Sequence, residues 1–196
     1  MRIVVVKLGG SLAAAATLRS WLDVLSSNGG GRSVVVPGGA EFADAVRAAQ
    51  RRHGFSDRAA HRMAMLAMEQ YAEMLAEMAP GLRPAESELE IQAILAKGGI
   101  ALWLPYRMAS ADPSIAESWA VSSDSLAAWL AGRLGAERLV LVKSAAAPKP
   151  TPSAAELAAL DLVDPAFPDY AQRAAFTLVY CGPGEERRLA QALQLG

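Results

Sequence analysis

Apolar residues recur along the chain in two spacings, and the two alternate from one end to the other. Short uninterrupted apolar runs predict strands covered on both faces, whereas apolar residues at i, i+3, i+4 and i+7 predict helices. The runs predict strands at 3–6, 33–36, 100–104, 138–142 and 176–180. The helical spacing, with its glycine and proline breaks, predicts helices near 18–25, 42–49, 58–78, 87–97, 123–134, 154–160 and 185–193.

This order of elements predicts an α/β fold, a three-layer αβα sandwich with a mainly parallel central sheet. Residues 106–121 have neither spacing and are expected to be irregular. The Ala/Pro-rich residues 145–153 are expected to form a mobile loop rather than a linker between domains. With 196 residues and 53% hydrophobic content, the chain is expected to form a single domain over 1–196.

The long helix expected at 58–78 is rich in methionine. Its methionines fall on more than one face of the helix, so the helix needs cover on more than one side. Ordinary core packing is one explanation. The other is a homo-oligomer built on a dimer through the helix 58–79. The methionines are Met63, Met65, Met68, Met74 and Met78.

Composition and charge narrow the class of function. The formal net charge of -1 gives no electrostatic case for binding nucleic acid. The single cysteine, Cys181, excludes an internal disulfide and fits a buried thiol in a reducing compartment. Lys7 ends the first apolar run well short of the about 7–15 residues of a signal-peptide core. No stretch approaches the roughly 20 apolar residues of a membrane span. We therefore expect a cytoplasmic protein that binds no membrane.

Two of the expected strands end in glycine pairs. Lys7-Leu8-Gly9-Gly10-Ser11 follows the first strand, and Gly38-Gly39 follows the second. Glycine lets the backbone approach a ligand closely and direct N–H groups at it. Lys7 adds a cation that suits a phosphate. The pattern indicates phosphoryl transfer rather than hydride transfer.

A third feature combines a helix start with the end of the next strand. Ser122-Ser123-Asp124 opens the helix, and Lys143-Ser144 follows the strand. Taken singly, a glycine pair can be a turn, Asp124 a helix-start residue and Lys143 a solvated cation. Their occurrence together in this order favours a site. The sequence has no P-loop, dinucleotide fingerprint, protein-kinase set, nucleophile elbow or zinc-spaced cluster, and no metal site is expected.

On these motifs the chain resembles the amino acid kinase family, which includes acetylglutamate, carbamate, aspartate and uridylate kinases. The resemblance rests on the two glycine loops and on Ser123-Asp124-x-x-Ala127-Ala128, and it covers nearly the whole chain. It implies an ATP-dependent phosphotransferase. Family members also pair through a helix in the part of the fold where the methionine-rich helix is expected.

Further phrases are similar to one branch of that family, the (5-(aminomethyl)furan-3-yl)methyl phosphate kinases of methanofuran biosynthesis. This similarity implies that the acceptor is a phosphate monoester bearing an amine and that the product is a diphosphate. The phrases include Gly38-Gly39-Ala40-Glu41-Phe42, Ala60-His61, Trp119-x-Val121 and Leu162-Val163-Asp164-Pro165.

The resemblance also implies a role for each motif residue, with ATP and Mg²⁺ as cofactors. Lys7 and Lys143 would stabilise developing charge, and Asp124 would hold the two lysines; Mg²⁺ would come with the nucleotide. Nucleotide binding is implied for Lys7, Gly9, Gly10, Ser11, Lys143 and Ser144. Acceptor binding is implied for Gly38, Gly39, Arg47, His61, Ser122 and Ser123. Arg62 is a further candidate for the acceptor phosphate, and Asp44 and Glu69 are candidates for its ammonium.

The chain departs from the family pattern beside the nucleotide. Residues 143–148 lack the usual Val-Asp-Gly segment, Ala40 replaces a common third glycine, and the final Gly-Thr-containing strand of many relatives is missing. These departures favour a non-catalytic nucleotide- or oxyanion-binding protein on the same fold. The joint presence of Lys7, Asp124 and Lys143 favours an enzyme. A nucleoside monophosphate kinase of the uridylate type is a third hypothesis, and a screen of phosphate acceptors would separate the three.

Overall fold

The computed structural model of the chain describes residues 2–194. Within them, one sheet has the strand order β3-β4-β2-β1-β5-β6, and every neighbouring pair is parallel. The strands are β1 (Val4–Leu8), β2 (Ser33–Pro37), β3 (Leu82–Ala85), β4 (Ile100–Trp103), β5 (Arg138–Val142) and β6 (Thr177–Cys181). The helices are η1 (Gly10–Ala14), α1 (Leu18–Asn28), α2 (Ala40–His53), α3 (Asp57–Met78), α4 (Glu88–Ala96), α5 (Pro105–Ala109), α6 (Ser123–Arg133), α7 (Ala154–Ala159), α8 (Phe167–Gln172) and α9 (Glu186–Leu193).

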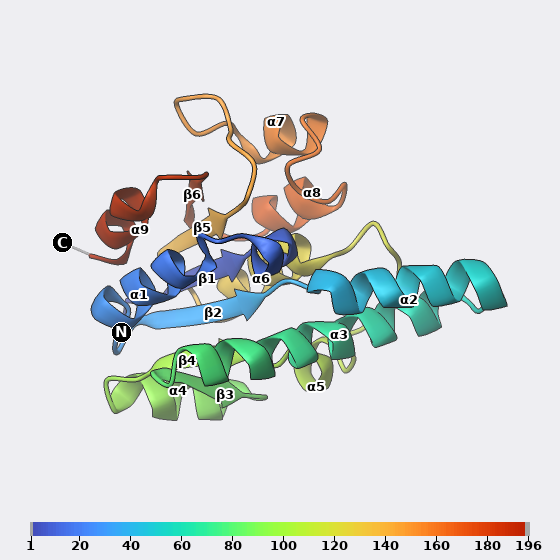
Figure 1. Cartoon of the computed structure of the whole chain (residues 1–196), viewed down its shortest axis with the longest axis horizontal. Helices are drawn as coiled ribbons and strands as arrows, with labels where there is room; N and C mark the ends of the chain where they lie inside the picture. Colours follow the sequence, from blue (N-terminus) through green and yellow to red (C-terminus); the bar gives the residue numbers. More distant parts are fainter. Residues whose placement is uncertain (1, 195–196) are drawn as a thin grey trace.

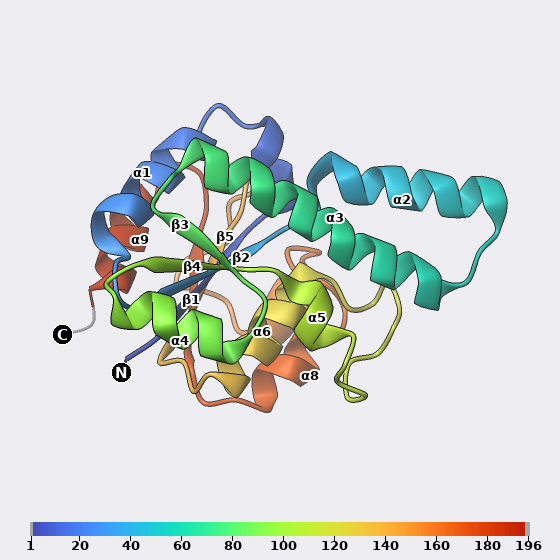
Figure 2. The same cartoon turned by 90° about the horizontal axis from the view of Figure 1, so that it is seen from below.

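Helices cover both faces of the sheet, which confirms the predicted three-layer αβα arrangement (Figures 1 and 2). Successive residues of β1 point to opposite faces, so Val5 lies in one buried cluster and Val4 and Val6 in another. Helices α1 and α9 and the second half of α3 pack on the face of Val4 and Val6. Helices α4, α6 and α8 pack on the face of Val5. Because both faces are buried, the central strands consist mostly of apolar residues, with Lys7 and Ser33 as the buried polar exceptions in β1 and β2.

Helices α2 and α3 form an antiparallel pair that projects beyond the sheet (Figure 2). Gly54, with φ of 68°, ends α2, and the Ser56 side chain caps α3 by accepting a hydrogen bond from the Ala59 N–H. Val46, Ala60 and Ala67 pack between the two helices. The base of the pair adjoins the end of β2, so the pair can form a wall beside that edge of the sheet.

The sheet is wholly parallel, where the sequence predicted a mainly parallel one. Four short elements were not expected from the apolar pattern. Strand β3 contains Pro84, which a strand tolerates at the edge of a sheet, where its missing N–H is not needed. Pro105 stops β4 and also begins α5, since proline suits the first turn of a helix. Residues 106–121 are therefore only partly irregular. The other two unexpected elements are η1 and α8.

The methionines of α3 divide between the interior and the surface. Met65 and Met68 are buried in the chain's own core, so for these two methionines core packing, rather than an interface, is the explanation. Met63 is 39% exposed, and its neighbour Leu66 is 43% exposed. Cys181 is a free, buried thiol at the end of β6, as predicted. In the described part of the chain, no helix is both long and apolar enough to cross a membrane.

Candidate functional site

The three sequence features meet at one edge of the sheet. Strand β1 lies between β2 and β5, and Leu8 is level with Pro37 on one side and with Val142 on the other. The residues that follow these three strands therefore emerge side by side at the carboxyl edge, where open α/β sheets bind ligands. Helix α6 brings Asp124 to the same place.

The two glycine loops pack directly against each other. A Cβ added at Gly38 would lie 2.2 Å from the Gly10 nitrogen, and one added at Gly10 would lie 2.6 Å from the Ala40 nitrogen. Only glycine allows backbones to come this close. Ala40 itself has φ of 48°, a left-handed conformation that favours glycine. Backbone strain of this kind is concentrated at functional sites.

A largely buried cluster of two lysines and one aspartate adjoins the first loop; Lys7 and Asp124 are buried, and the Lys143 side chain is partly buried. Asp124 Oδ1 is 2.8 Å from Lys7 Nζ, and Asp124 Oδ2 is 2.7 Å from Lys143 Nζ. Asp124 is the second residue of α6, and Ser122 occupies the N-cap position. The Asp124 carboxylate pairs with the lysines rather than serving as the cap. The predicted catalytic residues are thus in contact. Two cations and one anion leave the cluster with an excess positive charge.

Burial and the opposing charges set the protonation of this cluster. Burial alone would raise the pKa of Asp124, but Lys7 and Lys143 outweigh it and hold that pKa below its ordinary value. Burial and the neighbouring Lys7 lower the pKa of Lys143 to about 8, against the influence of Asp124. An anion beside the lysines would offset both effects. The cluster is therefore suited to receiving a negatively charged group.

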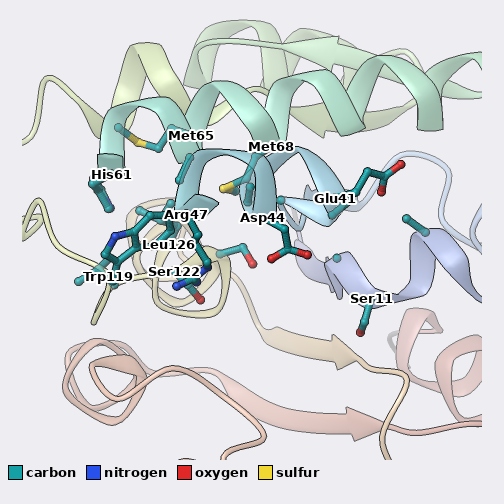
Figure 3. Close-up of a pocket in the computed structure, with 18 of the residues that line it drawn as sticks. Ser11, Glu41, Asp44, Arg47, His61, Met65, Met68, Trp119, Ser122 and Leu126 are labelled. Atoms are coloured by element: carbon teal, nitrogen blue, oxygen red, sulfur yellow. The ribbon is translucent and has the colours of Figure 1, made fainter. Parts of the chain in front are cut away.

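A cavity of about 410 Å³ opens between the loops, α2, α3 and the start of α6 (Figure 3). Its described lining includes Gly10 and Ser123, next to Asp124, but none of the three cluster residues. Met65, Met68 and Leu126 give it an apolar wall. Asp44 and Arg47, from α2, point into it, and Ser11 marks the end nearest the first glycine loop. Its size and its few polar groups are typical of a small-molecule site.

Arg47 and Trp119 form one side of this cavity. The Arg47 guanidinium lies 3.9 Å from the centre of the Trp119 ring, and Trp119 Nε1 donates a 2.6 Å hydrogen bond to Gln50. Among residues 2–194, no acidic side chain forms an ion pair with Arg47. The stacked guanidinium is held in place with its charge available to an anion.

His61 lies at the far end of the cavity and is only 2% exposed. Neither ring nitrogen makes a hydrogen bond to any described residue. Burial lowers the pKa of His61, although Glu117 and the Val121 backbone act in the opposite direction. A neutral imidazole offers one donor and one acceptor, and leaving such groups unpaired costs about 1–3 kcal/mol each. His61 is thus a polar group that a ligand or water in the cavity can meet.

The other candidates differ in where the fold places them. Gly39 and Ser123 line the cavity, and the Ser11 and Ser144 hydroxyls are 2.7 Å apart, which joins the ends of β1 and β5. Ser122 also lines the cavity, but its hydroxyl donates to Asp164. Two candidates lie elsewhere. Arg62 pairs with Glu117, and Glu69 accepts a hydrogen bond from the Tyr106 N–H at the start of α5.

Sequence reasoning missed the apolar wall and the role of Trp119. Met65, Met68 and Leu126 read as core or interface residues, because nothing in a helical pattern says that a buried face borders a cavity. Trp119 was a usable clue, since a tryptophan in an otherwise polar, irregular stretch needs a packing partner. Among the described residues there is no cluster of three or more His, Cys, Asp or Glu side chains that could hold a metal ion.

Comparison with known proteins gives three findings. The model of the amino acid kinase family matches residues 2–162. The [5-(aminomethyl)furan-3-yl]methyl phosphate kinase of Methanocaldococcus jannaschii is 28% identical over 138 residues, which are 70% of this chain and 63% of that protein. The match therefore spans less than two thirds of that relative's length.

Solved structures of uridylate kinases share the fold. The uridylate kinase of Archaeoglobus fulgidus superposes with a TM-score of 0.70 at 15% identity, covering 98% of this chain and 95% of its own. The UMP kinase of Bacillus anthracis superposes with a TM-score of 0.68 at 15% identity, covering 97% of this chain and 92% of its own. At this identity the likeness concerns the fold.

Proposed function

The chain belongs to the amino acid kinase family, and on that premise we propose that it is an ATP-dependent small-molecule kinase. The acceptor we propose is (5-(aminomethyl)furan-3-yl)methyl phosphate, which would become a diphosphate in the synthesis of a methanofuran-type cofactor. The observation that carries the proposal is the buried Lys7–Asp124–Lys143 cluster, with its excess positive charge beside two glycine loops.

The cluster suits phosphoryl transfer, which depends on positioning and on stabilising negative charge. Lys7 and Lys143 are held on one carboxylate, so their ammonium groups are fixed before any ligand arrives. Both oxygens of Asp124 are engaged by the lysines, which leaves no carboxylate oxygen free to act as a base. An acceptor that is already an anion needs no base. A phosphate monoester meets this requirement.

The residues beside the cluster fit a nucleotide polyphosphate. Lys7, Lys143 and the close-packed backbone of Gly9 and Gly10 would hold the phosphates, with Ser11 and Ser144 at the rim. ATP supplies the transferable phosphoryl group, and we expect Mg²⁺ to arrive with the nucleotide. The use of ATP as donor and the free thiol of Cys181 favour a cytoplasmic localisation.

The cavity fits the proposed acceptor in size and polarity. Its apolar wall of Met65, Met68 and Leu126 can take a flat ring. Arg47 offers charge for a phosphate, and Asp44 offers charge for an ammonium. The acceptor named for the curated relative carries both groups. Gly38 and Gly39 would bring backbone N–H groups to the reacting end.

We also propose a homo-oligomer in which α3 pairs with its copy. Met63 and Leu66 give the exposed side of α3 an apolar patch on the projecting helix pair. Met65 and Met68 are not part of that patch, because they pack inside the chain.

Measurement of ADP release from ATP and Mg²⁺, with a panel of phosphate acceptors, tests the proposed activity. We expect release to depend on (5-(aminomethyl)furan-3-yl)methyl phosphate and to be strongly slowed, but still measurable, in Asp124→Asn. Release that depends on UMP would favour the uridylate-type kinase. ATP binding without release for any acceptor would favour the non-catalytic binder.

A further inference from the structure

Asp164 connects a segment near the C-terminus to the start of the helix that carries Asp124. Its Oδ2 accepts hydrogen bonds from the Ser122 N–H at 3.0 Å, the Ser122 hydroxyl at 2.7 Å and the Ser125 N–H at 3.0 Å. Its Oδ1 accepts from the Ser125 hydroxyl. Asp164 is only 9% exposed. One carboxylate therefore binds the backbone and both hydroxyls of the serines that flank Asp124 on either side.

These bonds replace the cap that α6 lacks. The first N–H groups of a helix have no partner within the helix, and a side chain at the cap position usually accepts from them. Ser122 occupies the cap position of α6 but makes no such bond. Asp164, more distant in the sequence, takes over the task for Ser125. Its negative charge at a helix N-terminus is also favourable.

The residues around Asp164 hold the preceding loop at further points. The Ala166 N–H donates to the Ala120 carbonyl at 3.2 Å. The Tyr170 hydroxyl donates to the Ser114 carbonyl and accepts from the Ala116 N–H, both at 3.3 Å. The segment 164–170 thus fixes the stretch that ends at Ser122, which includes Trp119 of the cavity wall.

We propose that Asp164 is a positioning residue for phosphoryl transfer, which sets the place of Asp124 and, through it, of the two lysines. This rests on the proposed kinase function. Asp164 touches neither lysine, and it lies beyond residue 162, where the match to the family model ends. A displacement of about 1 Å in a catalytic group can reduce the rate by about 10²-fold. The alternative is a helix cap that contributes stability alone, about 1 kcal/mol.

Three variants separate these roles. Asp164→Ala removes all four bonds and is expected to lower kcat by about 10–10², with the KM for ATP changed little. Asp164→Asn is expected to keep most of the activity, because its amide oxygen can accept from both N–H groups and its NH2 can donate to Ser125. Asp112→Ala is the matched control. Asp112 also accepts hydrogen bonds, from the Ser114 N–H and from Trp129 further along α6, but it has no contact with the flanking serines.

A double-mutant comparison tests the route through Asp124. If Asp164 acts by placing Asp124, then Asp164→Ala should reduce kcat little further in an Asp124→Asn background. Multiplicative losses would contradict this route. If Asp164→Ala has the kcat of the wild type and only its midpoint of urea unfolding is lower, then Asp164 acts as a helix cap alone.

The titration of Lys143 gives a readout that does not need activity. In protein labelled with ¹³C-lysine, the Lys143 Cε signal should titrate near pH 8 in the wild type. Loss of Asp164 should loosen the pairing with Asp124 and move that titration to lower pH, whereas Asp164→Asn and Asp112→Ala should leave it in place. An unchanged titration in folded Asp164→Ala would overturn the proposal, even for an active enzyme. A shifted titration in a protein without kinase activity would instead fault the proposed function.

Discussion

Among single side chains, the Asp124 carboxylate determines most of the chemistry of the site. It neutralises one of two buried ammonium groups and leaves the other to be neutralised by a ligand. Buried charges without partners are strongly unfavourable, so the cluster favours the binding of an anion. The predicted effects at this site therefore concern affinity for phosphate groups and turnover more than folding.

Replacing Lys7 by alanine should strongly slow phosphoryl transfer and leave a folded protein. In Lys7→Ala, Asp124 keeps its ion pair with Lys143, so no buried anion is left unpaired. The loss of one charge-stabilising donor is expected to lower kcat by about 10²–10³. Lys97→Ala, which removes an exposed lysine at the end of α4, is the control. Near-normal turnover in Lys7→Ala, measured by ADP release, would remove Lys7 from the mechanism.

Affinity for ATP should fall as the pH rises above about 8. The pKa of Lys143 is lowered to about 8 in the free protein, and a bound polyanion raises it, so binding above pH 8 requires the uptake of a proton. The expected weakening approaches about tenfold per pH unit above that value.

Titration calorimetry in two buffers with different ionisation enthalpies measures this uptake directly. Lys143→Arg provides the comparison, because arginine keeps its charge throughout this range. An ATP affinity that is the same at pH 7 and pH 9.5 in the wild type would show that Lys143 does not contact the phosphates.

The site residues were predictable to different degrees. Lys7, Asp124 and Lys143 stand at strand ends and a helix start, where the order of elements alone brings them to one edge of the sheet. Glu69 does not line the cavity, and its carboxylate accepts a hydrogen bond at the start of α5, because a helical pattern does not show which carboxylate will reach a neighbouring helix. The role of Asp164 could not be recognised from the sequence, because its hydrogen-bond partners are distant along the chain; Ser122 is 42 residues away.

At the level of strands and loops, the contact between the two glycine loops fixes the shape of the site. Their backbones touch at Gly38 and Gly10, so the spacing of β1 and β2 continues beyond the sheet into the loops. A change that separates the loops should displace the backbone N–H groups from the lysine cluster.

Gly38→Ala is expected to separate them. The new Cβ would lie 2.2 Å from the Gly10 nitrogen, a distance that backbone movement must relieve at a cost of about 1–3 kcal/mol. Gly81→Ala is the matched control, because nothing lies within 4 Å of its Cβ position. Thermal unfolding should show a lower midpoint for Gly38→Ala only. Equal midpoints and equal kcat for the two variants would refute the close contact.

The apolar pattern was sufficient for five of the six described strands and for the longer helices. Strand β3 was missed because only its first and last residues are buried and it contains a proline. Helices α5 and α8, of 5 and 6 residues, were missed because such short segments display little of a helical period, although the equally short α7 was expected. Proline at their first turns was the available clue.

At the scale of the whole molecule, the projecting α2–α3 pair carries an apolar patch, among residues 2–194, that a single copy leaves uncovered. Its apolar patch of Met63 and Leu66 lies on the side of α3 away from the cavity residues His61 and Met65. A two-fold pairing of α3 would bury this patch and leave the cavity wall within each copy.

Light scattering at micromolar concentration should give the mass of a dimer, and Leu66→Glu should give a monomer. Leu89→Glu is the control, because Leu89 is an equally apolar and still more exposed residue on α4. A monomeric mass for the wild type would show that the patch is ordinary exposed surface and not an interface.

If the proposed function is correct, the Lys7–Asp124–Lys143 cluster moves a phosphoryl group from ATP onto a phosphate monoester. The ³¹P NMR spectrum of (5-(aminomethyl)furan-3-yl)methyl phosphate, after incubation with ATP, Mg²⁺ and the protein, tests it most directly. We predict that the single resonance of the acceptor is replaced by the two coupled resonances of a diphosphate, and that Asp124→Asn makes this conversion much slower. An unaltered acceptor resonance with the wild-type protein, under conditions where ATP binds, would contradict the claim.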